Sequence, residues 1–192
     1  KNNPVTIAVQ GYLEDNTEAP INLILAQGLP KADKMDFIVQ KAVELGVTEI
    51  QPLIMENCVV KYDEAKKSQR QTKWQKIANE AAKQCGRTVI PEIKPIITLG
   101  EFLKSLPKSC NKIVCYEAEN NNGIKKLLDN TNSVDYCVFV GPEGGFSNNE
   151  IKICNENSCQ PVTLGPRILR TETASLAAIS IILYHKGDLG GF

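Results

Sequence analysis

The sequence predicts an α/β protein with a mostly parallel sheet and helices on both faces of that sheet. Short apolar runs alternate along the chain with segments whose apolar residues recur at helical spacing. Glycine directly follows two of these segments, as is common at helix ends. The 192 residues are 42% hydrophobic and 23% charged, a composition typical of a folded globular domain. Sheets of this kind bind ligands beyond the carboxyl ends of their strands.

The first predicted elements lie between residues 21 and 86. Ile21–Ala26 and Glu49–Ile54 are apolar runs with the length of buried strands. A helix that ends at Gly46 is predicted between them, from the spacing of Met35, Ile38, Val39, Ala42 and Val43. The same spacing predicts a longer helix that ends at Gly86, from Trp74, Ile77, Ala78, Ala81, Ala82 and Cys85.

Two further strands are predicted over Lys112–Tyr116 and Tyr136–Val140, with a short helix over Ile124–Leu128 between them. Ser147 and Glu150 then form a capping box. The serine side chain can accept from a backbone N–H of the first turn, while the glutamate reaches back to the serine N–H. This pair therefore predicts the start of another helix.

The predicted fold ends with a short strand and a long helix. Pro161–Leu164 has the character of a strand, and Thr173–His185 has helical character. Because the helix is apolar on most faces, it is expected to be buried or to lie in an interface.

The first twenty residues differ from the remainder. Val5–Val9 reads as a strand, and Glu14–Pro20 is a polar, acidic segment with the character of a linker. One strand cannot form a domain, so residues 1–20 are predicted to be the end of one domain and residues 21–192 to form a second.

Composition excludes several classes. No apolar run approaches the roughly 20 residues of a membrane span, and the longest is Ala177–Tyr184. The first residues lack the apolar core of a signal peptide. The seven cysteines contain no Cys-x-x-Cys pair, which favours reduced thiols in a cytoplasmic protein without a metal site.

The charge is balanced overall but uneven along the chain. The 22 basic and 22 acidic residues give a net charge of zero. Between Lys61 and Lys94, nine basic and four acidic residues give 9 − 4 = +5. This segment is either an ordinary solvated helix face or a local surface for phosphates.

Two loops with Gly-Pro turns follow predicted strands, at residues 140–146 and 164–174. Neither is a Walker A motif, and neither fits Gly-x-Gly-x-x-Gly. They are either tight turns or two parts of one ligand site. Arg170 and Glu172 flank an expected helix start, where backbone N–H groups favour anions, although a simple surface ion pair is the alternative.

Both loops resemble the signature loops of the RsmE family, bacterial methyltransferases of small-subunit ribosomal RNA in the knotted SPOUT superfamily. The residues concerned are Gly141–Phe146 and Leu164–Ala174. The resemblance runs from about Asn22 to Leu189 and includes three more blocks. The first comprises residues 34–36 and 40–47, the second comprises residues 74–78, and the third comprises residues 80–87 and leads to Pro91. One departure is Asn57, where the family usually has arginine.

The resemblance implies transfer of the methyl group of S-adenosylmethionine to N3 of a uridine in 16S ribosomal RNA, within the small ribosomal subunit. It also implies a C-terminal trefoil knot, a homodimer and an N-terminal PUA-like RNA-binding β-barrel. Residues 1–20 would be the end of that barrel.

The same resemblance assigns roles to residues. Arg170 is the candidate for stabilising charge on the uracil oxygens or binding a flanking phosphate, and Glu172, with Glu143 as substitute, is the candidate base. The expected cofactor residues follow three strands: Tyr116, Glu117, Val140, Gly141, Pro142, Gly144, Leu164, Gly165, Pro166, Ile168, Leu169 and Thr173. The expected RNA-binding residues are Lys34, Lys41, Arg70, Lys73 and Arg87.

Two alternatives stay open at this point. A nucleotide-binding α/β protein would use the glycine loops for phosphate and would need a lysine beside them. A non-catalytic RNA-binding module would bind RNA but not S-adenosylmethionine.

Overall fold

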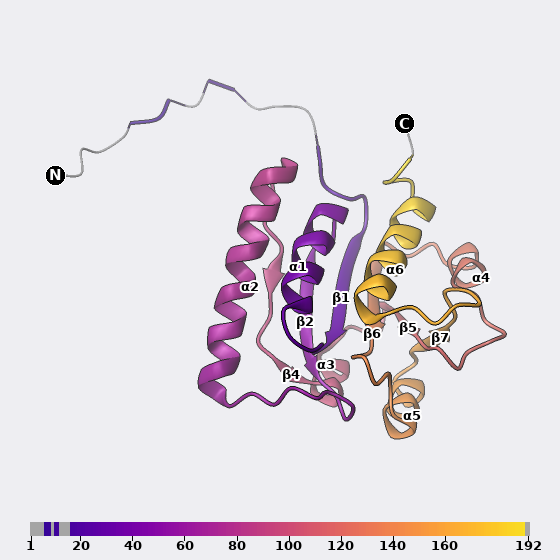
Figure 1. Cartoon of the computed structure of the whole chain (residues 1–192). Helices are drawn as coiled ribbons and strands as arrows, with labels where there is room; N and C mark the ends of the chain where they lie inside the picture. The colour runs from indigo at the N-terminus through magenta and orange to yellow at the C-terminus, as the bar shows by residue number, and fades with distance from the viewer. Residues whose placement is uncertain (1–5, 9, 12–15, 191–192) are drawn as a thin grey trace.

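The computed structural model describes residues 6–8, 10–11 and 16–190, and these residues form one parallel sheet with two layers of helices (Figure 1). The strand order is β3-β2-β1-β6-β5-β7, and β4 also pairs with β2. All the pairings are parallel, as predicted. The strands are β1 (Asn22–Gly28), β2 (Glu49–Ile54), β3 (Glu92–Ile93), β4 (Ile97–Thr98), β5 (Asn111–Cys115), β6 (Asp135–Val140) and β7 (Gln160–Val162).

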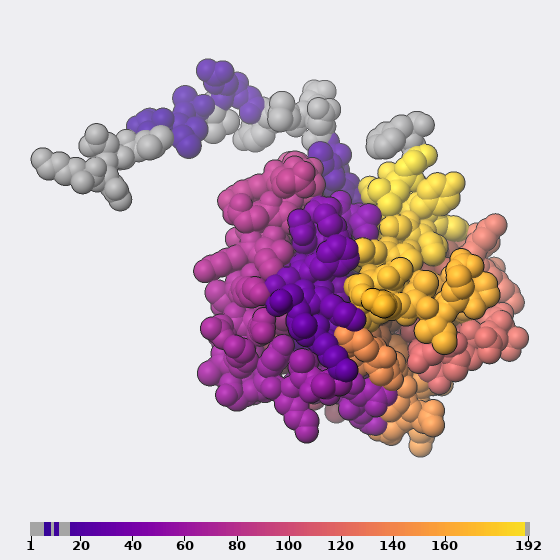
Figure 2. Space-filling model, viewed as in Figure 1, coloured from indigo at the N-terminus to yellow at the C-terminus, as the bar shows by residue number. Residues whose placement is uncertain are grey.

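The helices divide between two hydrophobic cores, one on each face of the sheet. The larger core receives α1 (Lys34–Leu45), α2 (Glu64–Cys85), α4 (Ile124–Asp129) and α6 (Thr171–His185). The smaller core receives α3 (Leu99–Ser105) and α5 (Asn148–Glu156). In the space-filling view α1 and α6 lie side by side, with α2 on the outer flank of α1 (Figure 2). Helices on both faces confirm the predicted class.

Most predicted elements are confirmed, together with the signals that predicted them. Gly46 and Gly86 end α1 and α2 with φ of +110° and +76°, a backbone conformation that glycine adopts without strain. Ser147 and Glu150 form the predicted capping box at the start of α5. The last strand and the last helix both begin earlier than predicted, at Gln160 and Thr171.

Helix α3 was not predicted, although its signal is present in the sequence. Thr98 accepts a hydrogen bond from the Glu101 backbone, and the Glu101 carboxylate accepts one from the Thr98 backbone. This is the same Thr/Ser-x-x-Glu signature that predicted α5. The helix is only seven residues long, too short for a clear apolar repeat.

The strand predicted over Val5–Val9 is not found in the described residues. Thr6, Ile7 and Ala8 are exposed and have no regular secondary structure, and the two end residues lie outside the described part of the chain. A strand needs a neighbour to receive its backbone hydrogen bonds, and the described residues offer none here. The assignment of residues 1–20 to a separate domain stays a prediction.

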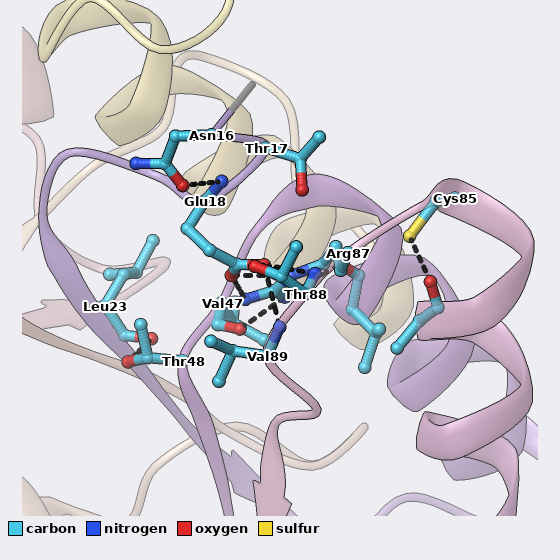
Figure 3. Close-up of polar contacts among 12 residues, drawn as sticks. Asn16, Thr17, Glu18, Leu23, Val47, Thr48, Cys85, Arg87, Thr88 and Val89 are labelled. Carbon is cyan, nitrogen blue, oxygen red and sulfur yellow. Dashed lines mark hydrogen bonds and ion pairs between the residues drawn. The ribbon is translucent and has the colours of Figure 1, made fainter. Parts of the chain in front are cut away.

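Arg87 and Glu18 join the linker-like segment to the ends of two helices (Figure 3). The Arg87 side chain is only 4% exposed, and its Nη1 donates to the carbonyls of Val43 and Val47 at 3.0 and 2.7 Å. Its Nε and Nη2 donate to Glu18. Arg87, predicted to bind RNA, is buried, and each nitrogen of its guanidinium already donates to an acceptor within the fold, which favours a structural role.

Helix α6 is buried on one side only. Ala178, Ile179, Ile182 and Leu183 lie in the core, whereas Tyr184 is 69% exposed. Within the described residues, no helix combines the length and the hydropathy needed to cross a membrane. All seven cysteines carry free thiols, five of them buried.

Candidate active site

Two adjoining hollows lie at the carboxyl ends of β5, β6 and β7, where the sequence placed the ligand site. Their volumes are about 310 and 120 Å³. Both are lined by Cys115, Glu117, Ile168, Leu169 and Ala174, so together they form one cavity with two lobes. The larger lobe adds Lys34, Val140, Gly141, Pro142, Glu143, Gly145, Arg170 and Thr171, and the smaller adds Tyr116, Asn120, Thr163, Leu164, Gly165, Pro166 and Arg167.

The loop after β6 takes its shape from close packing that only glycine permits. Gly145 has a φ of +66°, and a Cβ built on it would lie 2.3 Å from Oε1 of Glu117. Asn57 holds the same turn from the other side, since its Nδ2 donates to the carbonyls of Gly144 and Gly145 at 2.9 and 3.3 Å. The residue that departs from the family pattern therefore has a structural contact with the glycine loop.

A buried polar network fixes the start of α6 against the sheet. The Thr171 hydroxyl donates to the Gly141 carbonyl at 2.6 Å and accepts from Gln27 Nε2 at 2.9 Å. The Ser175 hydroxyl donates to Gln27 Oε1. Gln27, Thr171 and Ser175 are all buried, so the network ties β1, the loop after β6 and α6 together in the interior. Sequence reasoning missed Gln27, although a glutamine in an apolar strand was a usable signal.

Lys34 places one positive charge between the two candidate bases. Its Nζ lies 3.0 Å from Oε1 of Glu143 and 3.3 Å from Oε2 of Glu172. The Lys31 backbone also donates to Glu143, at 3.1 and 3.2 Å. Lys34 was predicted to bind RNA, but its ammonium is already engaged by two carboxylates at the cavity.

These contacts set the charge of the cluster. Burial is the largest single influence and favours a raised pKa for Glu143, but the hydrogen bond from Lys34, the backbone hydrogen bonds and the charge of Lys34 together hold the pKa of this carboxyl below its ordinary value. The hydrogen bond to Glu143 also raises the pKa of Lys34. Oε2 of Glu172 is buried without a hydrogen-bond partner in the described residues, although the Lys34 ammonium is close. The Glu172 carboxylate is therefore the less completely satisfied of the two.

Most of the predicted cofactor residues line this cavity. The exceptions are Gly144, whose carbonyl is held by Asn57, and Thr173, which is exposed on α6. Helix α6 starts at Thr171, earlier than predicted, so Thr171 and Ala174 face the cavity instead. Cys115, Asn120 and Gly145 also line it and were missed.

The remaining candidates are spread over several elements. Arg170 and Glu143 line the larger lobe. Glu172 is not part of that lining, but its carboxylate contacts Lys34, which is. Lys41 pairs with Glu44 of its own helix at 2.8 Å, away from any cavity lining.

Arg70 and Lys73 lie on α2. They line a separate hollow on that helix. The structure thus brings the catalytic candidates together with Lys34 and leaves the other basic candidates at different sites.

Known structures share this fold. The SpoU methyltransferase AviRb from Streptomyces viridochromogenes is similar in fold, with a TM-score of 0.52 at 13% identity over 88% of this chain and 62% of that one. A ribosomal RNA small subunit methyltransferase E from Neisseria gonorrhoeae, bound to S-adenosyl methionine, is 38% identical with a TM-score of 0.79, covering 88% of this chain and 69% of its own. The chain therefore has the fold of a methyltransferase.

Sequence comparison narrows the class. The model of the RNA methyltransferase domain family matches residues 17–183. The ribosomal RNA small subunit methyltransferase E of Bacillus subtilis is 35% identical over 97% of this chain and 75% of its own length. The chain belongs to the ribosomal RNA small subunit methyltransferase E family. This confirms the resemblance based on the glycine loops.

A second solved structure is similar to this chain in both sequence and fold. A putative methyltransferase from Legionella pneumophila, in complex with the bound cofactor S-adenosylmethionine, is 37% identical with a TM-score of 0.81. It covers 88% of this chain, and this chain covers 69% of it.

Proposed function

We propose that this chain transfers the methyl group of S-adenosylmethionine to N3 of a uridine in 16S ribosomal RNA, uridine 1498 by resemblance. The observation that carries the proposal is the two-lobed cavity built by the glycine loops. Relatives that are 37% and 38% identical hold S-adenosylmethionine in their structures.

The lining of the cavity suits this cofactor better than a nucleotide. Glycine, proline and apolar residues contribute to both lobes, and carboxylates of Glu117 and Glu143 line the larger one. Lys34 and Arg170 also line this lobe, so two cations balance two carboxylates and no excess positive charge is present to hold a chain of phosphates. The carboxylates can attract the positive sulfonium of S-adenosylmethionine. Lys34 is the lysine beside the loop, but two carboxylates already neutralise it. The nucleotide-binding alternative is therefore disfavoured.

The bound cofactor would supply an electrophilic methyl group, and the residues of the chain would prepare the uracil to accept it. N3 of uracil carries a proton that must leave, and the ring then spreads negative charge onto O2 and O4. We assign proton removal to Glu172, because hydrogen bonds from Lys34 and the Lys31 backbone lower the pKa of Glu143 and make its carboxylate a weaker proton acceptor. Arg170, which lines the larger lobe, would stabilise the charge on the oxygens or bind a flanking phosphate.

Three further proposals accompany the reaction. A homodimer would cover the exposed side of α6, where Tyr184 is 69% exposed. The trefoil knot that the resemblance implies would involve the C-terminal part of the chain, in which Thr171 at the start of α6 donates to the Gly141 carbonyl of the loop after β6. A cytoplasmic location follows from a ribosomal substrate.

Two measurements test the function. Calorimetry with S-adenosylmethionine and with ATP should give binding of the first only. Incubation with tritiated cofactor and small ribosomal particles that lack the modification should then label 16S RNA at one uridine, located by mass spectrometry. Binding of RNA without cofactor binding would favour the non-catalytic RNA-binding alternative and overturn the proposal.

A further inference from the structure

Helix α2 carries a row of cations on one face of its first half. Lys66, Arg70, Lys73 and Lys76 follow one another at intervals of three or four residues, which places them on the same side of a helix. A hollow of about 460 Å³ lies along this row. Its lining contains no carboxylate: Lys66, Gln69, Arg70, Thr72, Lys73 and Lys76. We refer to these six residues as the α2 basic face.

The positive charge of this face is largely unneutralised within the described part of the chain. Lys73 pairs with Asp36 of α1, but Lys66, Arg70 and Lys76 form no ion pair with any described residue. Lys66 donates instead to the neutral Gln69 at 3.0 Å. Elsewhere on the same helix, Lys83 is paired with Glu80 at 2.9 Å. Like charges at this spacing weaken a helix, so helix stability does not explain the row.

Arg70 has an additional unused donor. Its guanidinium lies over the Tyr62 ring, 5.7 Å from the ring centre, which fixes its position. Its Nε is buried and has no hydrogen-bond partner among the described residues. A held guanidinium with an unpaired N–H is suited to an anion that offers several acceptor oxygens.

The α2 basic face lies at the same end of the molecule as the cavity. Helix α2 follows the carboxyl end of β2, and its first half is therefore near the carboxyl ends of the parallel strands (Figure 1). Lys73 contacts Asp36 in the first turn of α1, and Lys34 of that same turn lines the cavity. Packed helices lie about 8–10 Å apart, so the face is roughly one helix spacing from the cavity.

We propose that the α2 basic face binds the phosphate backbone of the RNA strand that carries the target nucleotide. The proposal rests on the proposed function, because the target base must enter the cavity while its neighbours in the strand lie outside. Successive cations along about 15 Å of helix match the repeated phosphates of such a strand, and the Gln69 amide adds a neutral hydrogen-bond donor. Arg70, predicted from sequence to bind RNA, is central to this face.

The test compares two variants that remove the same charge from opposite sides of the sheet. The first is Lys66→Gln, Arg70→Gln, Lys76→Gln. The matched control is Lys104→Gln, Lys108→Gln, Lys152→Gln, whose exposed lysines lie on or near α3 and α5. Binding to a 16S RNA fragment that contains the target uridine is measured at several salt concentrations, together with calorimetry of S-adenosylmethionine.

The first variant should lose roughly tenfold or more in RNA affinity, and the slope of log K against log salt should become shallower by about 2, at ~0.7 per lost phosphate contact. The control should change affinity less than about twofold, and both variants should bind the cofactor as the unmodified chain does. Equal RNA affinity of the two variants, whether unchanged or reduced, would overturn the proposal. Failure of the unmodified chain to methylate small-subunit RNA would instead overturn the proposed function. Methyl transfer is measured in its own assay, so the two failures can be told apart.

Discussion

The molecule contains two clusters built from the same ingredients, a basic side chain and glutamates, which are put to different uses. In the first, Arg87 and Glu18 lie where the segment before β1 crosses the ends of α1 and α2 (Figure 3). In the second, Lys34 lies between Glu143 and Glu172 beside the cavity. The first joins parts of the fold, and the second faces a space large enough for a ligand.

The difference between the clusters is the completeness of their hydrogen bonding. Each nitrogen of the Arg87 guanidinium has an acceptor, and Glu18 also accepts from the backbone of Thr88 and Val89. In the other cluster one ammonium serves two carboxylates, and Oε2 of Glu172 has no hydrogen-bond partner in the described residues. A buried carboxylate oxygen whose nearest partner is an ammonium shared with a second carboxylate is incompletely satisfied, which is a reason to look for function there.

The largest expected effect is on the second cluster. Glu172→Gln keeps the size of the side chain but removes the proposed proton acceptor, so methyl transfer should fall by about 10²–10⁴-fold. Single-turnover transfer of tritiated methyl to small ribosomal particles measures this. Glu143→Gln is the comparison, and a larger loss in that variant would move the role of base to Glu143.

The next effect concerns the stability of the first cluster. Arg87→Met removes the ion-pair partner of Glu18 and the donor of two backbone carbonyls, and removal of one partner from a buried ion pair costs about 3–5 kcal/mol. Denaturant unfolding should therefore show a loss near the lower end of this range, because Glu18 retains some exposure. Lys83→Met, at an exposed pair on the same helix, should cost about 0–1 kcal/mol. Similar losses in the two variants would contradict a structural role for Arg87.

A smaller effect is expected in the pH dependence of that stability. Burial favours a raised pKa for Glu18, yet hydrogen bonds from Arg87 and from Val89 hold its pKa below the ordinary value of 4.5. A carboxyl with a lowered pKa in the folded state stabilises the protein above the unfolded pKa, and this stabilisation is lost as the pH falls through the folded pKa. The difference in unfolding free energy between the unmodified chain and Arg87→Met should therefore narrow below pH 4.5. If the difference in unfolding free energy stays constant from neutral to acid pH, the pair of Arg87 and Glu18 does not stabilise the folded protein in this way.

The elements of the fold were predictable because each has a local signal. Apolar spacing predicted α1 and α2, and glycine marked their ends. The glycine loops predicted the place of the cavity, since strand ends of a parallel sheet gather at one edge. Short elements such as α3 carry too few residues for a repeat, so only their capping signals remain.

The contacts inside the site were not predictable in the same way. Lys34 and Glu172 are far apart in the chain, and nothing local in either segment indicates that they meet. For the same reason charge alone could not separate Arg87, which is buried, from Arg70, which faces a hollow. A basic residue acquires its role from the partners that the fold brings to it, and those are known only once the strands are paired.

The smallest expected effect is at Asn57, at the edge of the second cluster. Its amide holds the carbonyls of Gly144 and Gly145, the residues that directly follow Glu143, but it does so from an exposed position. Asn57→Ala should therefore lower the free energy of unfolding by only about 0.5–1.5 kcal/mol. Because the glycine turn shapes the wall of the cavity, the affinity for S-adenosylmethionine should fall a few-fold in calorimetry.

Asn57→Arg introduces the residue usual in the family, and a guanidinium that reaches the same carbonyls would keep the affinity near that of the unmodified chain. If Asn57→Ala binds the cofactor with full affinity, the loop after β6 holds its shape through Gly145 packing alone, and the departure from the family pattern is neutral.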